Sequence, residues 1–152
     1  MLKLLDRTLR VILALLVAVL TTSVFLQVLI RFVFKYPIPW TEEVSRIAFI
    51  YTIFVGATIA VRQQAHLNVD FLLVALPPRA ARCLRILGTA LVAAFLLVVT
   101  WQGVVFVRAT GVQVTPVMQV PFRHLYLILP ATGGLMLLYL LAGAVDELRR
   151  GR

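Results

Sequence analysis

Three long stretches of this sequence contain no charged residue, and they restrict the fold more than any other feature. They cover residues 11–30, 86–107 and 125–145. An α-helix rises 1.5 Å per residue, so about 20 apolar residues cross a hydrocarbon core of about 30 Å. Each stretch is therefore long enough to be a transmembrane helix. The first exceeds the apolar region of a signal peptide, which has about 7–15 residues, and we expect it to be retained.

The composition also indicates a chain that is solvated by lipid. Apolar residues make up 62% of the 152 residues and charged residues 14%, whereas soluble domains have about 45–50% and about 25%. Too few polar side chains are present to cover a water-soluble globule. A net charge of +9 would favour nucleic acid as the partner of a soluble protein. Here most basic residues flank apolar stretches, where they direct topology and contact lipid headgroups.

A fourth span is expected between Arg46 and Arg62. Its charge-free part has only 15 residues, or about 23 Å of helix. The helix must therefore extend at its start through Glu42 and Glu43 to cross the core. We predict an all-α membrane protein, a single domain over residues 1–152, with four transmembrane helices in an antiparallel up-down arrangement at approximately 9–33, 42–63, 84–108 and 122–146.

The distribution of lysine and arginine predicts the orientation of these spans. Ten of these residues lie before the first span, between the second and third, and after the fourth, whereas the remaining segments hold five. Connecting segments rich in lysine and arginine stay in the cytoplasm. We therefore expect a multi-pass protein of the bacterial inner membrane with both termini in the cytoplasm.

The connection between the second and third spans is expected to lie in the membrane interface. Residues 71–76 form an apolar patch that is too short to span, and Pro77 and Pro78 end it. A basic face then opens the next helix, and its arginines are candidates for lipid-headgroup contacts: Arg79, Arg82 and Arg85. In the last span, Pro130 is expected to kink or loosen the helix, a change that packing in membranes tolerates.

Charged residues also mark the start of the second span. Thr41 is the expected N-cap, with Glu42 and Glu43 in the first turn, where acidic groups complement the helix dipole. Glu42 and Arg46 are spaced i,i+4 and can pair on one helix face. Two readings stay open. The cluster is either an exposed helix start with a local salt bridge, worth about 0.3–0.5 kcal/mol, or a surface that contacts a partner protein.

Several function classes are disfavoured. The three long charge-free stretches carry no ionisable group, whereas transporter cores place such groups near the midplane. A stand-alone small multidrug-type exporter, the alternative function, relies on a glutamate in its first helix, and residues 11–30 contain none. His66 and His124 are expected about 30 Å apart on opposite faces, so they cannot ligate one haem. No catalytic constellation is visible, and we expect no enzyme activity, metal or cofactor.

The segment from Arg31 to Arg46 reads RFVFKYPIPWTEEVSR. It resembles the signature of the small membrane subunit (DctQ type) of TRAP transporters. The similarity continues in the AHLNVD segment at 65–70, in Thr115-Pro116 and in the size and four-span plan of the chain.

The resemblance implies a tripartite system. Its partners would be a large membrane subunit of the DctM type, which carries substrate, and a periplasmic substrate-binding protein of the DctP type. It further implies secondary, usually sodium-driven uptake of carboxylates. The small subunit would be an accessory scaffold that holds no cargo or sodium site. His66 and Asp70 would lie at the cytoplasmic end of span two. The candidates for partner contact are then Pro37, Pro39, Trp40, Glu42, Glu43 and Arg46.

Overall fold

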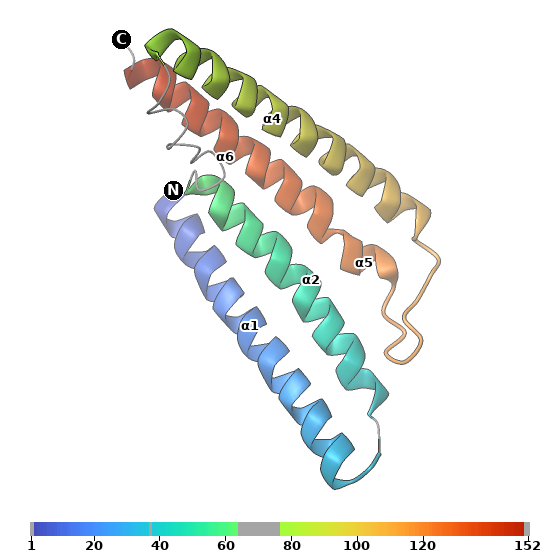
Figure 1. Ribbon diagram of the computed structural model, residues 1–152. Helices are drawn as coiled ribbons and strands as arrows, with labels where there is room; N and C mark the ends of the chain where they lie inside the picture. The colour runs from blue at the N-terminus through green and yellow to red at the C-terminus, as the bar shows by residue number, and fades with distance from the viewer. Residues whose placement is uncertain (1, 37, 64–76, 151–152) are drawn as a thin grey trace.

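The structure is a computed structural model that describes residues 2–36, 38–63 and 77–150 (Figure 1). Its helices are α1 (Leu2–Val33), α2 (Pro39–Arg62), α4 (Pro78–Ala109), α5 (Phe122–Tyr126) and α6 (Ile128–Arg150). Four segments are long and apolar enough to cross a membrane: Leu4–Val33, Pro39–Arg62, Ala80–Ala109 and Phe122–Ala144. The predicted all-α fold with four membrane-spanning helices is confirmed.

Proline determines where two of these spans begin or break. α4 already begins at Pro78, because proline at the first helical position lacks only an N–H that would have no partner there. The last span is divided at Leu127 into α5 and α6. Pro130 has no N–H to offer the carbonyl four residues earlier, and the predicted loosening of this helix is confirmed.

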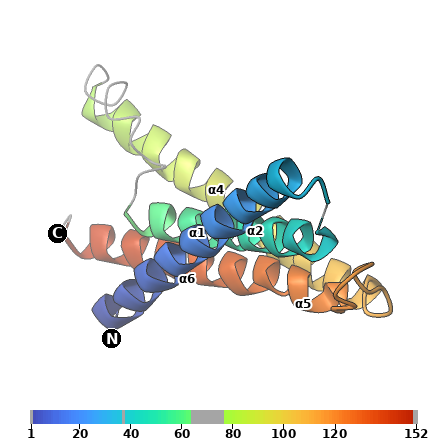
Figure 2. The same cartoon turned by 90° about the horizontal axis from the view of Figure 1, so that it is seen from below.

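The helices form an open row rather than a closed bundle. α1 packs against α2, α2 against α6, and α6 against α4, so that α1 and α4 lie at the two edges of the row (Figures 1 and 2). The first residues of α1 and the last described residues of α6 lie at one end, here called the terminal end (Figure 1). The start of α2 and residues 110–121 lie at the other, the loop end. Alternate crossing of a bilayer by the helices stays a prediction.

Two apolar clusters hold the row together. Leu9, Val55 and Tyr139 join α1, α2 and α6, and a second cluster between α4 and α6 consists of Leu96, Met136 and Leu140. Large apolar side chains on the outer faces of the edge helices are more than half exposed: Leu15, Phe25, Leu91, Phe95 and Trp101. Such surfaces are covered by lipid or by another protein.

Glycine allows close packing of α4 against α6, and Gly133 has the tightest contact. A Cβ atom on Gly133 would collide with the Oγ1 atom of Thr100. That hydroxyl is held in place because it donates a hydrogen bond to the Leu96 carbonyl at 2.7 Å. The neighbouring Gly134 has open space where its Cβ would lie. Small residues commonly allow such close helix contacts in membranes.

Candidate functional site

The start of α2 is defined by proline rather than by a polar cap. Pro39 occupies the first helical position, and Ile38 is the N-cap residue, with φ −103°, ψ 102° and no side-chain capping bond. The prediction that Thr41 caps this helix is wrong. Because Pro39 begins the helix earlier, Thr41 falls within its first turn. The Thr41 side chain is buried, and its hydroxyl donates to the Ile38 carbonyl at 2.7 Å.

Glu43 binds a distant part of the chain at the loop end. The residue is only 3% exposed. Its Oε1 atom accepts a hydrogen bond from the main-chain N–H of Val117 at 2.8 Å, and its Oε2 atom accepts one from Met118 at 3.0 Å. Hydrogen bonds to a carboxylate are shorter and stronger than those between neutral groups. Glu43 therefore fastens the first turns of α2 to residues 117 and 118.

Residues 110–121, here called the 110–121 loop, are also bonded internally. The N–H of Thr115 donates to the Val120 carbonyl at 3.0 Å, and the N–H of Phe122 donates to the Gln113 carbonyl at 2.9 Å. The Thr115 hydroxyl accepts from the Val120 N–H at 3.1 Å. Gln119 completes the reversal with φ 56°. At the tip of the loop, the N–H groups of Val117 and Met118 donate to Glu43.

The other candidates for partner contact lie around this connection. Pro39, Trp40, Glu42 and Arg46 are exposed, whereas Pro37 falls outside the described residues. Within the ranges that the structure describes, Glu42 and Arg46 do not form the predicted salt bridge. The cluster is thus divided: Glu43 is bound inside the chain, and the exposed residues surround it. A role for any of them in partner contact stays a prediction.

Apart from Trp40, the apolar side chains of the loop end were not singled out by the sequence analysis. Val112 is 95% exposed. With Trp40, Val114, Val117 and Met118, which are each exposed by a little under half, it forms a set that we call the loop-end surface. Exposed apolar groups are typical of interaction sites. The apolar residues between the breakers Gly111, Pro116 and Pro121 were the available signal.

A second polar connection lies at the terminal end and was also missed. Asp6 of α1 forms an ion pair with Arg62 of α2. The Tyr139 hydroxyl of α6 lies 3.5 Å from Asp6 Oδ1, and the Arg62 guanidinium carbon lies 5.4 Å from the centre of the Tyr139 ring. Three helices therefore meet at one carboxylate. The available signal was that Asp6 is the one acidic residue before Glu42.

The remaining predicted residues are less constrained by the structure. Arg82 and Arg85 are exposed on α4, to which Arg79 also belongs. His124 is exposed, and its carbonyl accepts a hydrogen bond from the Tyr51 hydroxyl at 2.8 Å. The predicted interfacial segment, His66 and Asp70 all fall within residues 64–76, outside the described ranges. Among the described residues, no group of three or more His, Cys, Asp or Glu could hold a metal ion.

The sequence of this chain matches a known protein family and several of its relatives. Residues 20–150 match the family of tripartite ATP-independent periplasmic transporters, DctQ component. A TRAP transporter small permease protein of Haemophilus influenzae is 28% identical over 125 residues, which are 82% of this chain and 76% of that protein. The sialic acid TRAP transporter small permease protein SiaQ of Vibrio cholerae is 36% identical over 45% of this chain and 38% of its own length.

A larger relative also contains a related segment. The isethionate TRAP transporter permease protein DctMQ of Oleidesulfovibrio alaskensis is 29% identical over 112 residues. The match covers 72% of this chain but only 18% of that protein. The related region is thus a small part of a much longer permease.

Proposed function

This chain belongs to the DctQ family of tripartite ATP-independent periplasmic transporters, and from this premise we propose that it is the small, non-enzymatic scaffold subunit of such a system. In this role it binds a large membrane subunit of the DctM type in the bacterial inner membrane, with both termini in the cytoplasm. It also supports docking of a periplasmic binding protein of the DctP type. The assembled system performs secondary, sodium-driven uptake of carboxylates.

The open row of helices carries this proposal. Transport through a single small subunit needs an enclosed or alternately closed path, whereas here α1 and α4 lie apart at the two edges of the row (Figure 1). Both edges expose large apolar side chains. Such a row offers broad apolar faces to a larger membrane protein and to lipid. The DctMQ relative supports the same partner, since its name joins both subunit types and the region like this chain is a small part of it.

Docking of the binding protein is assigned to the loop-end surface. Trp40 and Val112 expose apolar area there, and Glu42 and Arg46 add exposed charges. Glu43 contributes indirectly, because its carboxylate holds the 110–121 loop against α2. A surface whose backbone is held before binding loses less conformational entropy when a partner docks.

Co-purification tests the scaffold assignment. The full chain is expressed together with a large membrane subunit of the DctM type from the same genome, and both are extracted in detergent. We expect a stable complex, and we expect uptake in vesicles only when both subunits and the binding protein are present. Uptake by this chain alone would contradict the proposal and favour a small exporter-like protein. Failure to co-purify would contradict the scaffold role.

Matched tryptophan variants test the docking surface. Trp40→Ala and Arg46→Ala should weaken binding of the soluble binding protein to the purified complex and lower uptake, while membrane insertion is retained. For binding of the soluble protein, Trp101→Ala is the control, because Trp101 is 72% exposed on α4 rather than at the loop end. Uptake is not compared for this variant, since the same face of α4 is offered to the large subunit. Unchanged binding and uptake for both loop-end variants would remove this surface from the docking site.

A further inference from the structure

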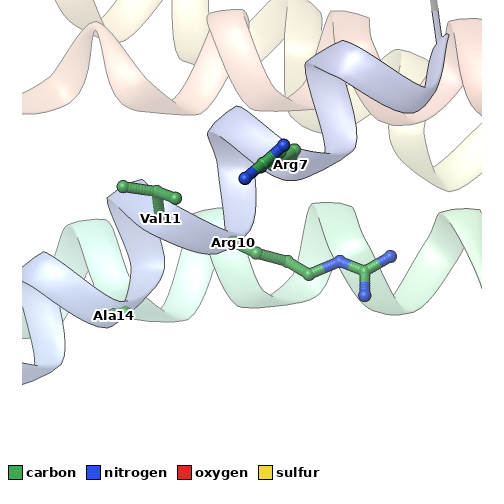
Figure 3. Close-up of a pocket in the computed structure, with 4 residues that line it drawn as sticks. All are labelled: Arg7, Arg10, Val11 and Ala14. Atoms are coloured by element: carbon green, nitrogen blue, oxygen red, sulfur yellow. The ribbon is translucent and has the colours of Figure 1, made fainter.

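Four residues on one face of α1 line a pocket at the terminal end. Arg7, Arg10, Val11 and Ala14 line a shallow hollow of about 410 Å³ that is open on the outer face of α1 (Figure 3). The spacing of these residues, i, i+3, i+4 and i+7, places them on the same side of a helix. The pocket therefore combines two guanidinium groups with an apolar floor.

The two arginines have no anionic partner among the side chains that the structure describes, which do not include those of residues 145–150. Both are exposed, and neither forms a hydrogen bond or ion pair there. Asp6, the acidic residue next to them in sequence, is already paired with Arg62. Arg10 also lines an adjoining pocket of about 190 Å³ to which Arg62 contributes. This end of the row thus presents an excess of positive charge.

The pocket lies where the chain changes from polar to apolar. Val11 is the first residue of the charge-free stretch 11–30, so the two guanidinium groups stand at the level of lipid headgroups in either orientation of the helix. Below the pocket, the same face continues with the exposed residues Leu15 and Ala18. An amphipathic ligand with an acidic head and an apolar tail matches this order of groups.

We infer that this pocket binds one anionic phospholipid, with the phosphate between Arg7 and Arg10 and an acyl chain along Val11, Ala14 and Leu15. A guanidinium fork forms two parallel hydrogen bonds to phosphate oxygens. A lipid with a net negative charge is preferred over a zwitterionic one, because the ammonium group of the latter is repelled by the neighbouring guanidinium groups. The bound lipid would cover the outer face of α1 at the terminal end, on the side away from the packing residues Leu9, Leu13 and Leu16.

Native mass spectrometry of the full-length chain in detergent tests the site. Phosphatidylglycerol and phosphatidylcholine with the same acyl chains are added separately, and the dissociation constant of the first bound lipid is measured. The variant R7Q/R10Q should weaken phosphatidylglycerol binding about thirtyfold, since each arginine near a membrane surface contributes about 1 kcal/mol. The control R31Q/R108Q removes two exposed charges from the last turns of α1 and α4, at the loop end, and should leave phosphatidylglycerol binding unchanged.

Other outcomes would overturn the site. An equal loss of phosphatidylglycerol affinity in the R31Q/R108Q control would show that any reduction of positive charge weakens binding. Equal affinity for phosphatidylcholine would remove the preference for anionic lipid, and displacement of the lipid by millimolar inorganic phosphate would identify free phosphate as the ligand. Unchanged lipid binding together with loss of the co-purified large subunit would assign the arginines to a protein contact. R7K/R10K keeps both charges but lacks the planar guanidinium groups, and it should bind phosphatidylglycerol several-fold more weakly. Unchanged affinity in both R7Q/R10Q and R7K/R10K would contradict the proposal.

Discussion

The Oε1 atom of Glu43 accepts a hydrogen bond from the Val117 N–H at 2.8 Å across a sequence separation of 74 residues. This contact joins the first turns of α2 to the loop that precedes α5. The carboxylate is buried, and its second oxygen accepts from Met118. Main-chain donors thus satisfy this buried carboxylate, which removes the cost of leaving it unpaired.

Replacing this carboxylate should release the loop tip. In Glu43→Gln, one of the two oxygens becomes an NH₂ group, which cannot accept a hydrogen bond from a main-chain N–H. We expect faster hydrogen exchange at the amides of Val117 and Met118, while exchange along α4 stays as it was. Glu42→Gln is the control, because Glu42 is exposed. Slow exchange at both amides in Glu43→Gln would show that the loop keeps its conformation without the Glu43 carboxylate.

The glycine pair in α6 allows a matched test of packing. Gly133→Ala should destabilise the protein by about 1–3 kcal/mol, because the new methyl group collides with Thr100 and overpacking costs this much. Gly134→Ala should be neutral or stabilising by up to about 1 kcal/mol, since alanine favours a helix. Thermal unfolding in detergent measures both. Thr100→Ala should restore much of the loss in a Gly133→Ala background; an additive double variant would argue against this contact.

The ion pair at the terminal end should contribute to stability. Asp6→Asn removes the charge that faces Arg62 and should lower the free energy of unfolding by about 1.5–3 kcal/mol, the usual contribution of a hydrogen bond to a charged group. The double variant Asp6→Leu/Arg62→Met should recover part of this loss, because apolar pairs often replace ion pairs at little cost. The comparison again uses thermal unfolding. An Asp6→Asn protein as stable as the original would show that the pair contributes nothing.

Reporter fusions test the orientation in the membrane. A reporter placed after residue 38, at the loop end, should be periplasmic, and one placed at the C-terminus should be cytoplasmic. This orientation is expected because the segments predicted to be cytoplasmic hold most of the lysine and arginine residues. An enzyme active only in the periplasm and a fluorescent protein active only in the cytoplasm give opposite readings at the two positions. The same compartment for both would break the four-span topology.

Local features of the sequence predicted the properties of individual segments, such as the number of helices and their approximate bounds. The charge-free stretches predicted four helices, and the short second stretch correctly implied that its helix extends back through Glu43 and Glu42. The predicted start at residue 42 lies after the observed start at Pro39. The cap was predicted wrongly because threonine is a frequent N-cap, whereas proline fixed an earlier start. The Glu42–Arg46 pair was expected from spacing alone. It does not form, because exposed pairs gain little and lose side-chain freedom.

By itself, the sequence determined that this chain needs lipid and crosses it with four helices. Length and hydropathy are properties of a continuous segment, and burial of apolar groups in the bilayer core acts on each segment separately. Only the tertiary structure decided which residues meet between segments: Glu43 with the 110–121 loop, and Asp6 with Arg62. Such pairs depend on how helices lie side by side, and packing of small and apolar side chains sets that arrangement. The spacing of residues along the chain does not predict this arrangement of the helices.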